Sequence, residues 1–88
     1  MNARKRELAR HALGLPNSTA RSYRNRYLAA YVPGGPYDLW DELVAAGLAE
    51  AGPFEKSGKS RWFSLTRAGA EAALDPGETL CPEDFTDA

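Results

Sequence analysis

The sequence predicts a small α+β domain that is mostly helical, with three helices, then a two-stranded hairpin and a short C-terminal helix. The chain has 88 residues, which is enough for one hydrophobic core. Its hydrophobic content of 43% and its charged content of 26% are ordinary for a globular domain. Helix-period apolar patterns fill the first half, whereas short strand-like runs come only after Gly47.

The first expected helix spans residues 3–13. Asn2 is a suitable N-cap, and Gly14 stands where a left-handed residue would end the helix. One side of the helix is apolar and leads from Leu8 through Ala12 to Leu15. Another side carries Arg6 and Arg10.

The second expected helix spans residues 19–31 and follows a helix-breaking Pro16. Tyr23, Tyr27 and Tyr31 recur every four residues and therefore share one face of such a helix. We expect this stripe to face the core, and its functional alternative is stacking on bases or on a partner.

The third expected helix follows the turn PGGP at 33–36, is capped by Asp38 and ends at Gly47. Its apolar face carries Leu39, Trp40, Leu43 and Val44. Its other face carries Asp38, Asp41, Glu42 and Ala45.

The hairpin is expected from strands at 48–52 and 61–65 around a loop rich in Gly, Pro and Ser. If Phe63 and Leu65 face the core, then Trp62 lies on the opposite face of the sheet. Thr66 caps the last helix, and Pro76 stops it. We therefore expect a domain at 1–75 and a partly ordered acidic tail at 76–88.

The charge is divided unevenly along the chain. Residues 1–27 hold seven Lys and Arg against one Glu, a net +6, whereas residues 28–88 hold four against eleven acids, a net −7. Such asymmetry favours a basic face for an anionic partner. The alternative, that the two halves neutralise one another in the fold, stays open.

Residues 39–74 resemble the last helix and wing of transcription regulators of the MarR and PadR-like type. The residues that carry the resemblance are Gly47-Leu48, the run Phe63-Ser64-Leu65-Thr66, and Gly69. It covers about 36 of the 88 residues and implies a winged helix-turn-helix fold. RHALGLPN at 10–17 and SYRNRYLAAY at 22–31 resemble small phage and prophage proteins. That resemblance implies a role in phage regulation or in countering a host system, in the cytoplasm of a bacterial host.

The first functional hypothesis is a non-enzymatic module that contacts nucleic acid, double-stranded DNA above all, through its basic half and its wing. The helix before the wing has acidic side chains where the resemblance implies contact with the major groove, and carboxylates repel phosphates. The second expected helix and the wing are therefore better candidates. The expected phosphate contacts are Arg6, Arg10, Arg21, Arg24, Arg26, Lys56, Lys59 and Arg61.

The alternative hypothesis is a protein-interaction module, such as a phage inhibitor of a host nucleic-acid-processing or defence complex (anti-restriction or anti-CRISPR-like). It would act through the acidic third helix and the wing. The residues expected to serve it are Asp38, Asp41, Glu42 and Trp62.

Other classes of function find little support in the sequence. His11 and Cys81 stand at opposite ends of the chain, so a catalytic Cys–His pair is not expected. The spacings of metal ligands are missing, and the GKS at 58–60 lacks the glycine and the helix of a P-loop. We expect no catalytic residues, metal, cofactor or membrane span, and either a monomer or a small homodimer.

Overall fold

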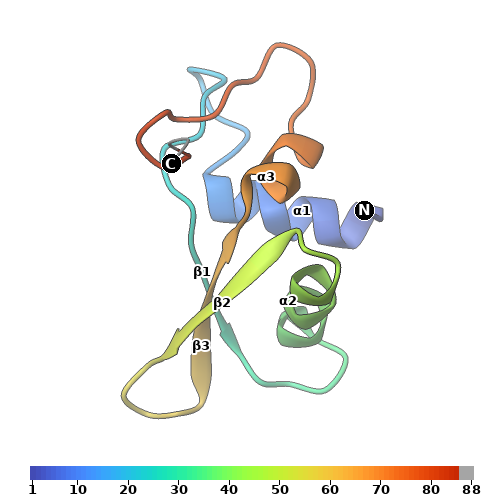
Figure 1. Ribbon diagram of the computed structural model, residues 1–88, viewed down its shortest axis with the longest axis vertical. Helices are drawn as coiled ribbons and strands as arrows, with labels where there is room; N and C mark the ends of the chain where they lie inside the picture. The colour runs from blue at the N-terminus through green and yellow to red at the C-terminus, as the bar shows by residue number, and fades with distance from the viewer. Residues whose placement is uncertain (86–88) are drawn as a thin grey trace.

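A computed structural model describes residues 1–85 as three helices and a three-stranded antiparallel sheet with strand order β1-β3-β2 (Figure 1). This confirms an α+β fold, but one strand replaces an expected helix, so the chain is less helical than predicted. The elements in chain order are α1 (Ala3–Leu13), β1 (Tyr27–Ala30), α2 (Pro36–Ala45), β2 (Ala49–Phe54), β3 (Ser60–Leu65) and α3 (Arg67–Ala72).

Helix α1 has the predicted bounds and both predicted caps. The Asn2 side chain accepts a hydrogen bond from the Lys5 backbone N–H at 2.9 Å. Gly14 ends the helix in the left-handed conformation, with φ of 80°, and its N–H bonds to carbonyls of the last turn. Ala12 and Leu15 are buried and Leu8 packs partly against the core, as the pattern predicted. Arg10, expected at the surface, is buried.

The predicted helix over residues 19–31 is wrong. The segment forms a turn, an extended stretch and then β1, which pairs antiparallel with β3 so that Tyr27 lies opposite Phe63. Tyr27 packs against the core, whereas Tyr23 and Tyr31 are 63% and 60% exposed. Residues four apart share a face in a strand as well as in a helix, so the tyrosine spacing fits both structures.

Helix α2 starts earlier than predicted. Pro36 occupies its first turn and Gly35 is the N-cap, so Asp38 lies inside the helix instead of capping it. The Asp38 carboxylate accepts a hydrogen bond from the Gly34 N–H at 2.7 Å and so steadies the turn before the helix. Trp40 is fully buried, in agreement with the predicted apolar face.

The β2–β3 hairpin is confirmed, with strands slightly longer than predicted. Phe63 and Leu65 are 1% and 4% exposed and face the helices, so alternation along β3 turns Trp62 to the other face of the sheet. A bulge between Ala51 and Phe54 shifts the register near the hairpin tip.

The two parts of the motif that carries the resemblance, Gly47-Leu48 and Thr66 to Gly69, touch one another where the hairpin closes. The Thr66 hydroxyl donates to the Gly47 carbonyl at 3.0 Å, and the Thr66 N–H donates to the Leu48 carbonyl at 3.1 Å. The same hydroxyl accepts from the Gly69 N–H at 3.2 Å and so caps α3. Gly69 packs directly on Leu48, which leaves no room for a side chain at residue 69. The motif therefore fixes α3 to the start of β2.

Six aromatic rings form a continuous series of contacts that passes through the core and ends at two exposed residues, His11 and Tyr31. Neighbouring ring centroids lie 5.2 to 5.7 Å apart, in the range of favourable aromatic pairs. The order of contact is His11, Tyr27, Trp40, Phe63, Tyr37 and Tyr31. Burial of Trp40 and Phe63 at the centre of this chain makes them the main support of the core.

The C-terminal segment 75–85 returns to the first part of the chain (Figure 1), where residues 79–83 lie along residues 19–23. Thr79 forms a parallel bridge with Arg21, and the Cys81 N–H donates to the buried Ser22 hydroxyl at 2.8 Å. Phe85 is 9% exposed and belongs to the core. The described part of the segment expected as a tail is therefore attached to the domain by hydrogen bonds and by one aromatic anchor.

Candidate nucleic-acid interface

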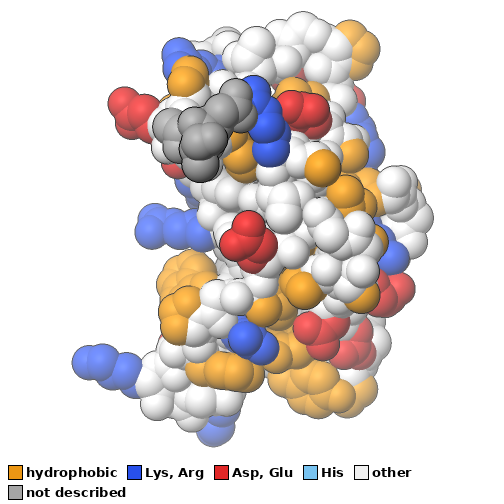
Figure 2. Space-filling view, viewed as in Figure 1, with side chains coloured by type: hydrophobic (Ala, Val, Ile, Leu, Met, Phe, Trp, Pro, Cys, Tyr) orange, Lys and Arg blue, Asp and Glu red, His pale blue; other side chains and the backbone are white. Residues whose placement is uncertain are grey.

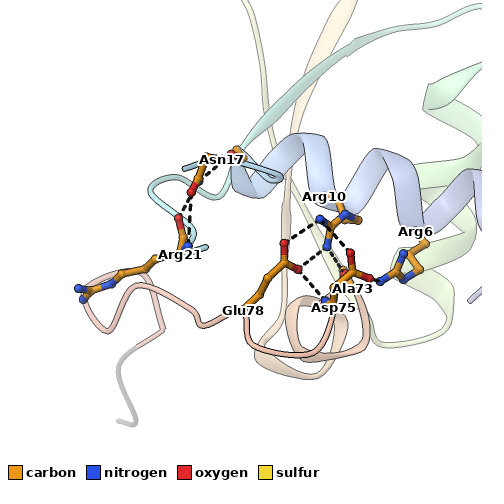
Figure 3. A network of polar contacts seen from close by, with 8 residues as sticks. Arg6, Arg10, Asn17, Arg21, Ala73, Asp75 and Glu78 are labelled. Carbon is orange, nitrogen blue, oxygen red and sulfur yellow. Dashed lines mark hydrogen bonds and ion pairs between the residues drawn. The ribbon is translucent and has the colours of Figure 1, made fainter. Parts of the chain in front are cut away.

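Two of the eight basic candidates are held in an ion-pair network with the C-terminal segment. The Arg10 guanidinium bonds to the Glu78 carboxylate through two nitrogen–oxygen contacts of 2.5 and 2.8 Å and also donates to the Ala73 carbonyl. Arg6 pairs with Asp75, which also lies 3.4 Å from Arg10. Figure 3 shows both guanidinium groups pointing toward these carboxylates. Arg6 and Arg10 are therefore occupied within the fold.

The hydrogen bond between Arg10 and Glu78 shifts the pKa values of both groups. The hydrogen bond from Arg10 lowers the pKa of Glu78 to about 2, with a further contribution from the Asp75 backbone N–H and against the effect of burial. The same hydrogen bond raises the pKa of Arg10. Both groups therefore stay charged near neutral pH, as a structural ion pair.

Arg24 is held at the C-terminal end of α1. Its guanidinium donates twice to the His11 carbonyl, at 2.8 and 3.3 Å. The last carbonyls of a helix lack partners within the helix and carry partial negative charge, which favours a cation there. The neighbouring carbonyls of Ala12 and Leu13 accept from the N–H groups of Arg26 and Tyr23. The end of α1 thus fixes the course of residues 23–26.

Arg26 and Trp62 meet on the face of the sheet that points away from the core. The Arg26 guanidinium lies 5.9 Å from the centroid of the Trp62 ring, in cation–π range. Leu28 is the register partner of Trp62 and is 38% exposed. A hollow of about 280 Å³ opens here, lined by His11, Arg24, Arg26, Tyr27, Leu28 and Trp62.

The β2–β3 hairpin carries the basic residues that were predicted to lie on a wing. Lys56 and Lys59 are exposed, and within residues 1–85 neither forms an ion pair. Arg61 is different, because it lies over the Phe54 ring at 4.7 Å and donates to the Gly52 carbonyl at 2.7 Å. Its register partner Ala29 is buried on the inner face, so Arg61 does not share a face with Trp62.

Arg21 lies at the other end of the molecule, beside the C-terminal segment. Its backbone carbonyl accepts from the Asn17 amide at 2.8 Å, whereas its guanidinium points away from the Arg10 network (Figure 3). Within residues 1–85 it forms no ion pair.

The acidic residues of the alternative hypothesis are partly engaged within the fold. Glu42 pairs with Lys5 at 3.1 Å, and Asp38 bonds to the Gly34 N–H. Asp41 is exposed. Trp62 belongs to the opposite, basic face and is not joined to this helix.

Charged side chains of both signs are spread over the face seen in Figure 2. Lys and Arg side chains project at its lower left, beside an area of hydrophobic side chains, and a group of Asp and Glu side chains lies at its lower right, where Figure 1 places α2. Sequence analysis missed the exposed Leu28 and the part played by the end of α1. The sequence signal for the second of these was the helix stop at Gly14, followed by a basic segment at 21–26.

Comparison with protein-family models, curated proteins and solved structures found no match for this chain. Within residues 1–85, His, Cys, Asp and Glu side chains form no group of three or more that could hold a metal ion. In the same residues, the helices are too short or too polar to cross a membrane.

Proposed function

We propose that this protein is a small, non-enzymatic, winged-helix-like module that binds nucleic acid through the open face of its sheet and its hairpin tip. One contrast carries the proposal. Lys5, Arg6 and Arg10 are neutralised by carboxylates, whereas Arg26, Lys56 and Lys59 have no ion-pair partner within residues 1–85. Positive charge on the open face of the sheet and at the hairpin tip is therefore not paired with carboxylates in the described residues, which suits a polyanion.

The winged-helix assignment is supported by the second half of the chain. Helix α2, the β2–β3 hairpin and α3 follow one another in the order that the resemblance implies, and the Gly47-Leu48 and Thr66–Gly69 parts of the motif are in contact. Because α2 exposes Asp41 and pairs Glu42 with Lys5, we assign the phosphate contacts to the sheet and the wing. A phage or prophage origin remains part of the proposal and rests on the resemblance of residues 10–31.

The test is the fluorescence anisotropy of labelled random-sequence duplex DNA, titrated with protein at about 50 and about 200 mM salt. We expect micromolar binding that weakens steeply at the higher salt. Arg26→Glu should lower the affinity at low salt by about tenfold or more, the equivalent of about 1.4 kcal/mol.

The matched control is Arg4→Glu. It changes the net charge by the same amount at an exposed residue near the N-terminal end of α1, whereas Arg26 lies beside the C-terminal end of that helix. Equal losses from the two variants would show that binding follows net charge and not this surface. Absence of binding to both duplex and single-stranded DNA at low salt would overturn the proposal in favour of a protein partner for the acidic helix.

A further inference from the structure

The open face of the sheet carries more than positive charge, because the Trp62 ring lies beside Arg26 and lines the same hollow as Arg24. Trp62 is half-buried there, whereas the other tryptophan, Trp40, is fully buried in the core. Phosphate contacts need no aromatic group, so this ring is not explained by binding to the backbone of a duplex. We propose that the hollow beside Trp62 holds one unpaired nucleotide of a single-stranded nucleic acid. This inference rests on the proposed function.

The geometry supplies both a surface on which a base can stack and a cation for its phosphate. Trp62 and the guanidinium of Arg26 are planar groups on which a base can stack. The Arg24 guanidinium is fixed by two hydrogen bonds to the His11 carbonyl and lines the same hollow, so it is placed in advance for a phosphate oxygen. Leu28 gives the hollow an apolar wall.

The size and the surroundings of the hollow restrict its occupant. Its volume of about 280 Å³ is at the lower limit of the range of about 300–1,000 Å³ typical of small-molecule sites, which suits one base and not two. Glu50 of β2 also places a carboxylate on this face, but its partner across the sheet is Ser64 and not Trp62. A phosphate is therefore directed toward Arg24 and Arg26 and away from β2. Lys56 and Lys59 at the hairpin tip extend the contact to further phosphates, so we assign the site to a strand and not to a free nucleotide.

The test compares labelled oligothymidine with an abasic strand of the same length, about a dozen residues, which has the same phosphates and no bases. We expect the protein to bind oligothymidine at least about fivefold more tightly, since one stacked base contributes roughly 5- to 150-fold. Trp62→Ala should bring the affinity for oligothymidine down to that for the abasic strand, while Trp62→Phe should keep most of the difference. Circular dichroism and a thermal melt establish that each variant is folded.

Tryptophan fluorescence gives a second measurement. Oligothymidine should quench the emission of the wild-type protein, and the quenching should vanish in Trp62→Phe, whose remaining Trp40 is shielded in the core. Equal affinity for the two strands, with no effect of Trp62→Ala, would overturn the nucleotide site and leave the proposed function standing. Competition by free thymidine monophosphate at the same nucleotide concentration would overturn the assignment to a strand. No binding of duplex, oligothymidine or abasic strand at low salt would overturn both proposals.

Discussion

Arg10 and Glu78 are 68 residues apart in sequence and form a two-point ion pair that joins the first helix to the C-terminal segment. Both side chains are about nine-tenths buried, at 10% and 9% exposure. A bidentate contact between arginine and carboxylate is among the stronger polar interactions in proteins. The pair therefore explains how an acidic segment with few apolar residues stays attached to a basic helix.

Replacing Glu78 with Ala should destabilise the protein strongly. Removal of one partner leaves the Arg10 charge buried and uncompensated, which costs about 3–5 kcal/mol in comparable pairs. That loss is a large share of the total free energy of unfolding, roughly 4–13 kcal/mol, expected for a domain of this size. Urea unfolding measures the loss. Glu83→Ala is the control, since that side chain is exposed, and a loss no greater than in this control would contradict the structural role of the pair.

The contribution of Glu78 should also depend on pH in a defined direction. Its pKa falls from an ordinary value of 4.5 to about 2 in the folded protein. A lowered folded-state pKa gives stability that is complete above the unfolded-state value and is lost as the pH falls toward 2. The difference in free energy of unfolding between the wild type and Glu78→Gln should therefore shrink between pH 5 and pH 2.5, by on the order of 2 kcal/mol. A difference that stays constant over this range would contradict the shift.

Gly69→Ala should disrupt the closure of the hairpin. A Cβ at residue 69 would lie 1.9 Å from the Leu48 carbonyl oxygen, so backbone must move. We expect a loss above about 2 kcal/mol, in the range of overpacking in a core. Gly34→Ala provides the comparison, because its φ of 75° is unfavourable for alanine but its surroundings are empty, which limits the cost to roughly 1–2 kcal/mol. Similar melting temperatures for the two variants would contradict the close packing of Gly69 on Leu48.

Phe63 and Trp62 are neighbours on β3 whose truncation should have very different consequences. Phe63 stacks on Trp40 with centroids 5.7 Å apart and is 1% exposed, so Phe63→Ala should cost about 3–5 kcal/mol. Trp62 lies on the open face, and Trp62→Ala should cost less than about 1.5 kcal/mol. Chemical denaturation of both variants tests which face of the sheet belongs to the core. A larger loss from Trp62→Ala would reverse the assignment of faces.

The elements that the sequence predicted well are those with local signals at both ends. Asn2 and Gly14 bound α1, and Thr66 caps α3, and each of these contacts reaches only three or four residues along the chain. Alternation along β3 was also sufficient to place Trp62 opposite the buried Phe63. Such features depend on local backbone geometry and on the period of the apolar pattern, both of which can be inferred from a single sequence.

The features that were not predicted depend on partners far away in the chain. Strand β1 exists because Tyr27 pairs with Phe63, and nothing local distinguishes its tyrosine spacing from that of a helix. Likewise the charge of Arg10 is evident from the sequence, but its burial against Glu78 depends on how the C-terminal segment returns to α1. The prediction of the candidate interface was affected most, because five of its eight expected basic residues lie either on the segment whose predicted structure was wrong or in the ion-pair network.

The salt dependence of binding tests how many phosphates the hairpin tip contacts. Lys56 and Lys59 are exposed, so replacing both with Ala should leave stability within about 0.5 kcal/mol of the wild type. Each phosphate contact contributes a slope of about −0.9 to the logarithm of the affinity for duplex DNA against the logarithm of salt concentration. If both lysines contact phosphates, the double variant should reduce the steepness by about 1.8, because two counterion-releasing contacts are gone. Arg4→Ala should leave the slope unchanged, and an unchanged slope in the double lysine variant would remove the hairpin tip from the interface while keeping the sheet face as its centre.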